Sequence, residues 1–259
     1  RFDAAGGLEW SRLHGGSHED QARALAIGPH EVAYVVGTTR SRDLPTEQAF
    51  QERSGDEGLD DNRTDGFVLR LHPRGGFVLS SSYLGGARYD VPNAVAVGAD
   101  GRAVVAGATQ SLDFPVVAPL QRAPGAASPA DGSFDGFVVG LSWDLDVEFA
   151  TYLGGVSSDH LRAAALLPDG LVVVAGTTDG GGFPVAGGGR PLAAGGHPGG
   201  AAPVTAVLTS SGSRLLFADH GLAADVRLAP GGTLVSPDAE LAVEWSGVVR
   251  RGAPHAGVP

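Results

Sequence analysis

A motif that recurs three times constrains the fold of this chain more than any other feature. Each copy ends in a glycine pair, and an aspartate stands four residues after the second glycine. The copies lie about 70 residues apart, at Gly15-Gly16, Gly85-Gly86 and Gly154-Gly155. Each aspartate opens a short apolar segment, which is followed by a Val-rich segment ending in Gly-x-Thr and then by a proline. A fixed period of this kind indicates one supersecondary unit that has been copied.

The second copy shows what one unit contains. Residues 93–97 and 102–107 are short apolar segments joined by Ala99-Asp100-Gly101, which predicts a β-hairpin. Residues 135–141 and 147–153 predict two further strands after a loop rich in Pro, Ala and Gly. The corresponding segments are 24–27, 32–36, 67–71 and 77–84 in the first copy, and 163–167, 171–175, 204–208 and 215–218 in the third. No segment keeps a helical period over about ten residues, so each unit is predicted to be a four-stranded antiparallel sheet.

Four short strands per repeat predict the blade of a β-propeller. We expect one all-β domain over residues 1–259, with repeats at approximately 8–77, 78–147, 148–214 and 215–250, the last being degenerate. The last unit lacks a fourth strand, whereas residues 8–13 resemble a fourth strand without its first three. We therefore predict that the N-terminal strand completes the last blade and closes a four-bladed ring, which removes exposed sheet edges. The alternative is an arc of a larger propeller.

The motifs also resemble a known family. Tyr-Leu-Gly-Gly-x-x-x-Asp, Ala-Val-Ala-Val, Gly-x-Thr-x-Ser-x-Asp-Phe-Pro and Asp-Gly-Phe-Val-x-x-Leu follow one another in the second unit, between Tyr83 and Leu141. This series resembles the bacterial SBBP repeat, a β-propeller repeat. The first unit departs from it at His14 and Leu44, and the third departs in its last two motifs. The resemblance implies a propeller and no particular reaction, because the family is defined by architecture.

Composition and charge disfavour several kinds of partner and exclude the chemistry of cysteine. The formal net charge of −11 disfavours a nucleic acid or an anionic membrane as the main partner. No apolar run approaches the ~20 residues that span a bilayer. The chain has no cysteine, which excludes disulfides and thiolate zinc sites. All 18 basic residues are arginine, and together with abundant Ala, Gly, Val and Pro this indicates a GC-rich bacterial genome.

The topology predicts where candidate binding residues gather. The turns that carry the repeated aspartates and the long loops between the second and third strands should lie at the same end of each sheet. One face of the molecule would then collect Asp20, Asp90 and Asp159. These side chains either form an acidic ring that binds a ligand or a cation such as Ca²⁺, or accept backbone N–H bonds and recur because the unit recurs. We favour the second interpretation.

Residues 56–65 suggest a second cation site, again for Ca²⁺. Asp61 and Asp65 fit two positions of a calcium loop, but Arg63 stands where the loop needs an oxygen ligand. A solvated acidic loop is the favoured interpretation. No nucleophile elbow, His-Glu-x-x-His motif or phosphate loop is present in the sequence, and we predict no catalytic residue.

These observations favour a non-enzymatic binding or structural module. We expect it at the cell surface, in the periplasm or outside a bacterial cell, with its loop-rich face against a protein or glycan partner. Two alternatives remain open. A polysaccharide hydrolase or lyase would use Asp20, Asp90 or Asp159 as acid or base. A structural subunit of a larger surface assembly or fibre would expose an apolar patch on a side or face.

Overall fold

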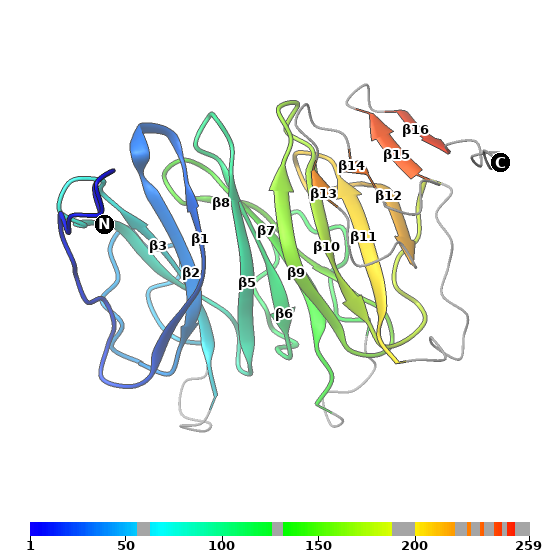
Figure 1. Cartoon of the computed structure of the whole chain (residues 1–259). Helices are drawn as coiled ribbons and strands as arrows, with labels where there is room; N and C mark the ends of the chain where they lie inside the picture. The colour runs from blue at the N-terminus through cyan, green and yellow to red at the C-terminus, as the bar shows by residue number, and fades with distance from the viewer. Residues whose placement is uncertain are drawn as a thin grey trace.

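The computed structural model describes residues 1–55, 63–125, 132–187 and 200–220, together with four short strands between residues 227 and 251. These residues form antiparallel four-stranded sheets and almost no helix (Figure 1). A three-residue 3₁₀ turn at Pro29–Glu31 is the one helical element of the described residues. The predicted all-β fold with four strands per unit is therefore confirmed.

The strands follow chain order within each sheet. Sheet 1 contains β1 (Asp20–Ile27), β2 (Ala33–Thr39), β3 (Asp65–Leu71) and β4 (Val78–Leu84). Sheet 2 contains β5 (Asp90–Val97), β6 (Ala103–Thr109), β7 (Asp135–Leu141) and β8 (Val147–Leu153). Sheet 3 contains β9 (Asp159–Leu166), β10 (Val172–Thr178), β11 (Ala202–Leu208) and β12 (Leu215–His220). The last sheet contains β13 (Arg227–Leu228), β14 (Leu234–Val235), β15 (Leu241–Glu244) and β16 (Val248–Arg251).

Sheets 1, 2 and 3 stack face to face, with β5 lying against both β1 and β9 (Figure 1). Every residue of β6 and β7 is buried, because sheet 2 is covered on both faces. This explains why the central strands are continuous apolar runs without alternation. The core between sheets 1 and 2 is built from Tyr34, Val36 and Val68 on one side and Val105, Phe137 and Val139 on the other. The core between sheets 2 and 3 includes Val104, Ala106, Val138, Val172, Val174 and Val204.

The N-terminal segment does not complete the last sheet. The fourth strand of that sheet is β16, and residues 9–13 form no strand. Instead Trp10 donates its Nε1–H to the carbonyl of Pro73, at 3.0 Å, in the turn between β3 and β4. The N-terminus lies beside sheet 1, at the opposite end of the molecule from β15 and β16 (Figure 1). The prediction that residues 8–13 close the ring is therefore wrong, because the last unit has a fourth strand of its own in Val248–Arg251.

The long loops pack along the outer strands instead of projecting freely. Isolated antiparallel bridges join Glu47 to Ser81 of β4 and Val117 to Ala150 of β8. A similar bridge joins Ala186 to Ala218 of β12. Each outer strand thereby gains a partner along the edge that the sheet leaves unpaired, which blocks pairing with other chains. No described helix is long and apolar enough to cross a membrane.

Candidate functional site

The repeated aspartates stand at one end of each sheet, as expected. Each is the first residue of the first strand, and it lies opposite the last threonine of the second strand: Asp20 opposite Thr39, Asp90 opposite Thr109, and Asp159 opposite Thr178. These threonines in turn lie opposite the first residue of the third strand, which is Asp65, Asp135 and Ala202. The aspartate turns and the starts of the long loops therefore share one end of the molecule.

Asp90 is held by the turn that precedes it and by the loop that follows β6. Its Oδ2 accepts hydrogen bonds from the backbone N–H of Gly86 and from the Ser111 hydroxyl, both at 2.8 Å. The side chain is fully buried. Asp90 thus joins the turn between sheets 1 and 2 to the loop that follows β6, and its carboxyl group faces no solvent.

Asp20 and Asp159 repeat this arrangement with one difference. Oδ2 of Asp20 accepts from Gly16 N at 2.8 Å and from the Ser41 hydroxyl at 3.0 Å. Oδ2 of Asp159 accepts from Gly155 N at 2.7 Å. In the third unit Gly180 stands at the position of this serine, so the serine hydroxyl that binds Asp20 and Asp90 is absent there.

The Ser-x-Asp-Phe-Pro segment is tied to the outer strand by a tyrosine. In sheet 2 the Tyr152 hydroxyl donates to the Ser111 carbonyl at 2.7 Å and accepts from Phe114 N at 3.1 Å. The Asp113 carboxylate accepts from the backbone N–H of Ala87 at 2.9 Å, in the turn between sheets 1 and 2. The Ser-x-Asp-Phe-Pro motif therefore has a structural role: it holds its loop to the outer strand and to the turn between the sheets.

The same clamp is present in sheet 1. Tyr83 donates its hydroxyl to the Ser41 carbonyl at 2.7 Å and accepts from Leu44 N at 2.9 Å. Asp43 accepts from Ser17 N at 2.8 Å. Leu44 fills the position of the phenylalanine without changing these bonds.

Two pairs of buried aspartates lie where neighbouring sheets meet. An ideal Cβ on Gly85 would stand 2.7 Å from Oδ2 of Asp90 and 3.0 Å from Oδ1 of Asp65. On Gly154 it would stand 2.8 Å from Oδ2 of Asp159 and 2.0 Å from Oδ1 of Asp135. Gly85 and Gly154, the first residues of their glycine pairs, must therefore be glycine, because a Cβ has no room beside the two carboxyl groups.

One carboxyl group of each aspartate pair has a raised pKa. Burial raises the pKa of Asp90 to about 8, and the charge of Asp65 adds to the shift. Burial likewise raises the pKa of Asp159 to about 7, with a further contribution from Asp135. Hydrogen bonds to the charged form act in the opposite direction but are outweighed. Asp90 is therefore mainly protonated at neutral pH and Asp159 titrates there, and their second oxygens, Oδ1, are buried without a hydrogen-bond partner.

Each repeated aspartate is bound within its own unit. No group of three or more His, Asp or Glu side chains within the described ranges is placed to hold a metal ion. Oδ2 of Asp65 accepts the backbone N–H of Gly55 at 2.6 Å. Asp61, the other residue of the proposed calcium loop, lies outside the described residues.

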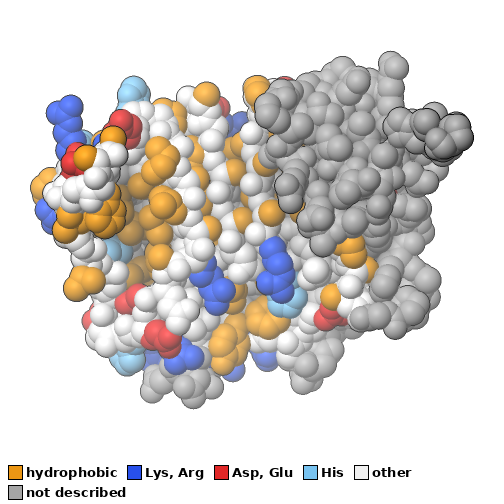
Figure 2. All heavy atoms as spheres, in the orientation of Figure 1, with side chains coloured by type: hydrophobic (Ala, Val, Ile, Leu, Met, Phe, Trp, Pro, Cys, Tyr) orange, Lys and Arg blue, Asp and Glu red, His pale blue; other side chains and the backbone are white. Residues whose placement is uncertain are grey.

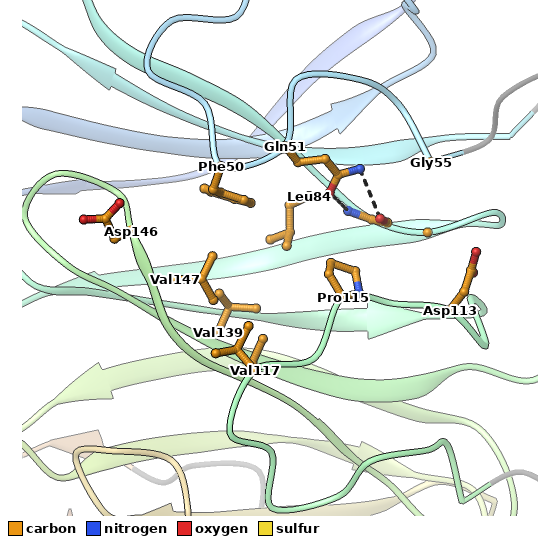
Figure 3. Close-up of a pocket in the computed structure, with 13 residues that line it drawn as sticks. Phe50, Gln51, Gly55, Leu84, Asp113, Pro115, Val117, Val139, Asp146 and Val147 are labelled. Carbon is orange, nitrogen blue, oxygen red and sulfur yellow. Dashed lines mark hydrogen bonds between the residues drawn. The ribbon is translucent and has the colours of Figure 1, made fainter.

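A cavity of about 520 Å³ lies between sheets 1 and 2, and its lining combines residues of the repeat motifs with residues outside them. Phe50 and Leu84 of sheet 1 face Val139 and Val147 of sheet 2 across it (Figure 3). The other lining residues are Gln51, Gly55, Gly85, Gly86, Asp113, Pro115, Val117, Asp146 and Ala150. The lining is therefore mainly apolar, with polar groups at its ends.

The walls of the cavity are held in place by backbone hydrogen bonds. Val117 N donates to the Ala150 carbonyl at 3.0 Å, and Ala150 N donates to the Val117 carbonyl at 2.8 Å. The Gln51 amide accepts from Gly85 N and donates to the Gly85 carbonyl, both at 3.2 Å (Figure 3). Ligand cavities in proteins are usually preformed in this way.

Opposite ends of the cavity carry Asp146 and Asp113, and both side chains are exposed (Figure 3). One repeated feature of the sequence could have indicated this site. Gln51 and Gln121 occupy equivalent positions in the first two long loops, and each binds the backbone of the glycine pair through its side chain. The apolar lining gave no comparable signal, because Phe50, Val117 and Val147 resemble ordinary core residues in sequence.

No protein-family model matches the chain, and no curated protein sequence matches it.

Proposed function

We propose that this protein is a non-enzymatic binding module whose cavity between sheets 1 and 2 receives an apolar side chain of a protein partner. The observation that carries the proposal is the cavity itself, with its apolar middle and its two carboxylate ends. An apolar lining favours an aliphatic side chain over the hydroxyl groups of a glycan, because buried hydroxyls without partners are costly. The exported bacterial location expected from the composition and from the resemblance to the SBBP repeat is part of this proposal.

The charges define the partner further. Asp113 and Asp146 stand at the ends of the cavity, and the chain as a whole has a net charge of −11. Both facts favour a partner segment with an arginine or lysine next to the inserted aliphatic side chain. We therefore propose an aliphatic–basic peptide segment as the ligand.

The buried aspartates favour this function over hydrolysis of a polysaccharide. A glycosidase needs two carboxyl groups that reach the scissile bond. Asp90 and Asp159 are fully buried, and their Oδ2 atoms are engaged with backbone N–H groups. Their raised pKa values are consistent with a structural role in the junctions between sheets.

A propeller arrangement of the sheets would give the binding surface a rigid scaffold. We propose that the sheets are propeller blades, with β1, β5 and β9 as inner strands and β4, β8 and β12 as outer strands. The alternative, an arc of a larger propeller, fits the position of the N-terminal segment beside sheet 1. Rigid sheets with loops at one end are the usual setting for a binding surface.

Selection from a random peptide library on phage tests the proposal. We expect the immobilised full chain to enrich peptides that contain an aliphatic residue beside Arg or Lys. The enriched peptide is then synthesised, and its affinity is measured by fluorescence anisotropy against the wild type and the variant Val117→Asp. Val117 is 40% exposed and holds β8 through its backbone, so the variant is expected to fold. A carboxylate in the apolar lining should weaken binding at least tenfold.

Val185→Asp is the matched control, because Val185 is 38% exposed in the corresponding loop of sheet 3 and does not line the cavity. Its affinity for the peptide should equal that of the wild type. A library that yields no such peptide, or a peptide that binds Val117→Asp as tightly as the wild type, would overturn the proposal.

A further inference from the structure

A second cavity, of about 730 Å³, lies at the end of sheet 1 opposite the repeated aspartates. The N-terminal segment, the turn between β1 and β2 and the turn between β3 and β4 meet there. Figure 2 shows side chains of both charges and histidine close together at the upper left, where Figure 1 places these segments. The side chains of its lining include Arg1, Glu9, Trp10, His30, Glu31 and Arg74. We call this cavity the turn cleft.

Trp10 provides an aromatic wall of the turn cleft, and its ring is held in place. Its Nε1–H donates to the Pro73 carbonyl at 3.0 Å. The ring packs against Gly76, where a Cβ would have no room beside it. The side chain is only half-buried, so part of its surface remains free for a ligand that enters the cleft. An indole placed in this way offers an apolar surface inside a polar site.

A single guanidinium positions two carboxylates beside this wall. Arg1 Nε lies 2.6 Å from Oε2 of Glu9, and Arg1 Nη1 lies 2.9 Å from Oε2 of Glu31. Arg1 Nη1 also donates to the Pro73 carbonyl at 3.2 Å, the same carbonyl that binds the indole. A carboxylate accepts up to about four hydrogen bonds, and the Glu31 side chain is 67% exposed, so capacity remains for a ligand.

The charges of the lining define the class of ligand. Arg1 and Arg74 balance Glu9 and Glu31, so the cleft favours neither an anion nor a cation. The net charge of the chain, −11, further disfavours an acidic ligand. The lining supplies hydrogen-bond donors and acceptors together, and a hydroxyl group uses both because it donates and accepts. A ligand with many hydroxyl groups and one apolar face therefore fits the cleft.

The backbone at Glu31 gives independent support for a ligand. Its φ is 60°, whereas the second and third units have Gly101 and Gly170 at this position. The turn therefore forms without a side chain here, and the fold does not require the glutamate. Non-glycine residues in this region of φ are strained, and such residues cluster at ligand sites, where the strain is offset by function.

We propose that the turn cleft binds a neutral saccharide. The apolar C–H face of a sugar ring packs on Trp10, and the hydroxyl groups bind Glu9, Glu31 and Arg1. Other residues line the cavity between sheets 1 and 2, so the saccharide site is separate from the peptide site proposed above.

An array of neutral and acidic oligosaccharides tests the proposal. The full chain is applied with a C-terminal affinity tag for detection, and the oligosaccharide with the strongest signal is titrated by calorimetry. We expect a neutral oligosaccharide to bind, and Trp10→Leu to weaken its binding at least tenfold. Tyr89→Leu is the matched control, because Tyr89 is also half-buried but stands just before β5, at the other end of the sheets. Its affinity should equal that of the wild type.

A second pair of variants tests the carboxylate without removing the aromatic wall. Glu31→Gln keeps the shape of the side chain and should weaken binding severalfold. Glu19→Gln is its control, because Glu19 also forms an exposed ion pair, with Arg40 at 3.2 Å, but precedes β1 at the other end of sheet 1. Val117→Asp should likewise leave the affinity for the oligosaccharide unchanged.

Each other outcome overturns the proposal. An array without any signal above background means that the cleft takes no saccharide. Binding of acidic oligosaccharides alone contradicts the neutral ligand class. A neutral oligosaccharide that binds Glu31→Gln and Trp10→Leu as tightly as the wild type occupies another site.

Discussion

Asp65 of sheet 1 and Asp90 of sheet 2 place their carboxyl groups on either side of Gly85, in the turn that links the two sheets. Both side chains are buried. Two carboxyl groups this close do not both ionise easily, so a proton on Asp90 becomes part of the sheet junction. The junction between sheets 2 and 3 has the same design in Asp135 and Asp159.

This pair predicts a pH dependence of stability. The pKa of Asp90 rises from 3.8 to about 8 on folding, so the folded protein binds the proton more tightly than the unfolded chain. The stability from this group is then complete below the ordinary pKa of 3.8, and it is lost as the pH rises to about 8. We expect Asp90→Asn, which stays neutral, to gain stability relative to the wild type over this interval.

Urea unfolding of both proteins at a series of pH values measures the effect. The difference between their free energies of unfolding should change steadily from pH 4 to 8 and level off above pH 8. Asp159 titrates in both proteins and cancels in the difference. Curves that stay parallel across the whole interval would show that Asp90 is ionised in the folded state.

The tyrosine clamp predicts a second loss of stability. Tyr152→Phe removes both the donor to the Ser111 carbonyl and the acceptor for Phe114 N, and both partners are buried. Unsatisfied buried groups cost about 1–3 kcal/mol each, so we expect a loss of about 2 kcal/mol or more in the free energy of unfolding. Tyr34→Phe is the control, because the Tyr34 hydroxyl donates to one backbone carbonyl, that of Gly101, and its other polar contact is with the Arg70 side chain. Equal effects of the two variants would contradict the clamp.

Much of the fold followed from the repeat alone. The glycine pair, the Val-rich segment and the Asp-Gly turns located the strands of sheets 1 to 3 because these features report local backbone geometry. The prediction for the end of the chain was wrong because these local features are weak there. Its last strand, Val248–Arg251, is short and precedes no glycine pair, so the repeat pattern favours residues 8–13 in its place.

The site was harder to predict than the fold. The repeated aspartates stood out in the sequence because the unit recurs, and their hydrogen bonds explain that recurrence without a ligand. The cavity depends on which loop residues of sheet 1 face which strand residues of sheet 2. Such contacts between units are set by sheet packing, and no spacing within one unit reports them.

A strained turn in the first unit predicts a stabilising substitution. Glu31 has a φ of 60°, where the second and third units have Gly101 and Gly170 with φ of 83° and 84°. A residue with a Cβ in this region costs roughly 1 kcal/mol or more relative to glycine. We expect Glu31→Gly to raise the free energy of unfolding by about 1 kcal/mol, measured by chemical denaturation.

The ion pair of Glu31 with Arg1, at 2.9 Å, is exposed and contributes little to the balance. Glu31→Ala is the control for it, because alanine removes the ion pair and keeps the strain. Its stability should not exceed that of the wild type. If alanine stabilises as much as glycine, the gain does not come from the backbone.

Arg70 provides the last prediction. It is buried in β3, with its guanidinium 5.5 Å from the Tyr34 ring and 4.6 Å from the Trp143 ring of sheet 2. Its guanidinium donates a hydrogen bond to the Ser80 hydroxyl, at 3.4 Å, and its buried Nε has no acceptor. A charge held mainly by aromatic rings retains much of its desolvation cost, so an apolar side chain of similar length should replace it without loss.

We expect Arg70→Met to match or exceed the wild type in thermal stability, whereas Arg70→Ala, which leaves a cavity at the same contact, loses about 2 kcal/mol or more. A large loss in both variants would mean that the two rings bind the cation more strongly than burial penalises it.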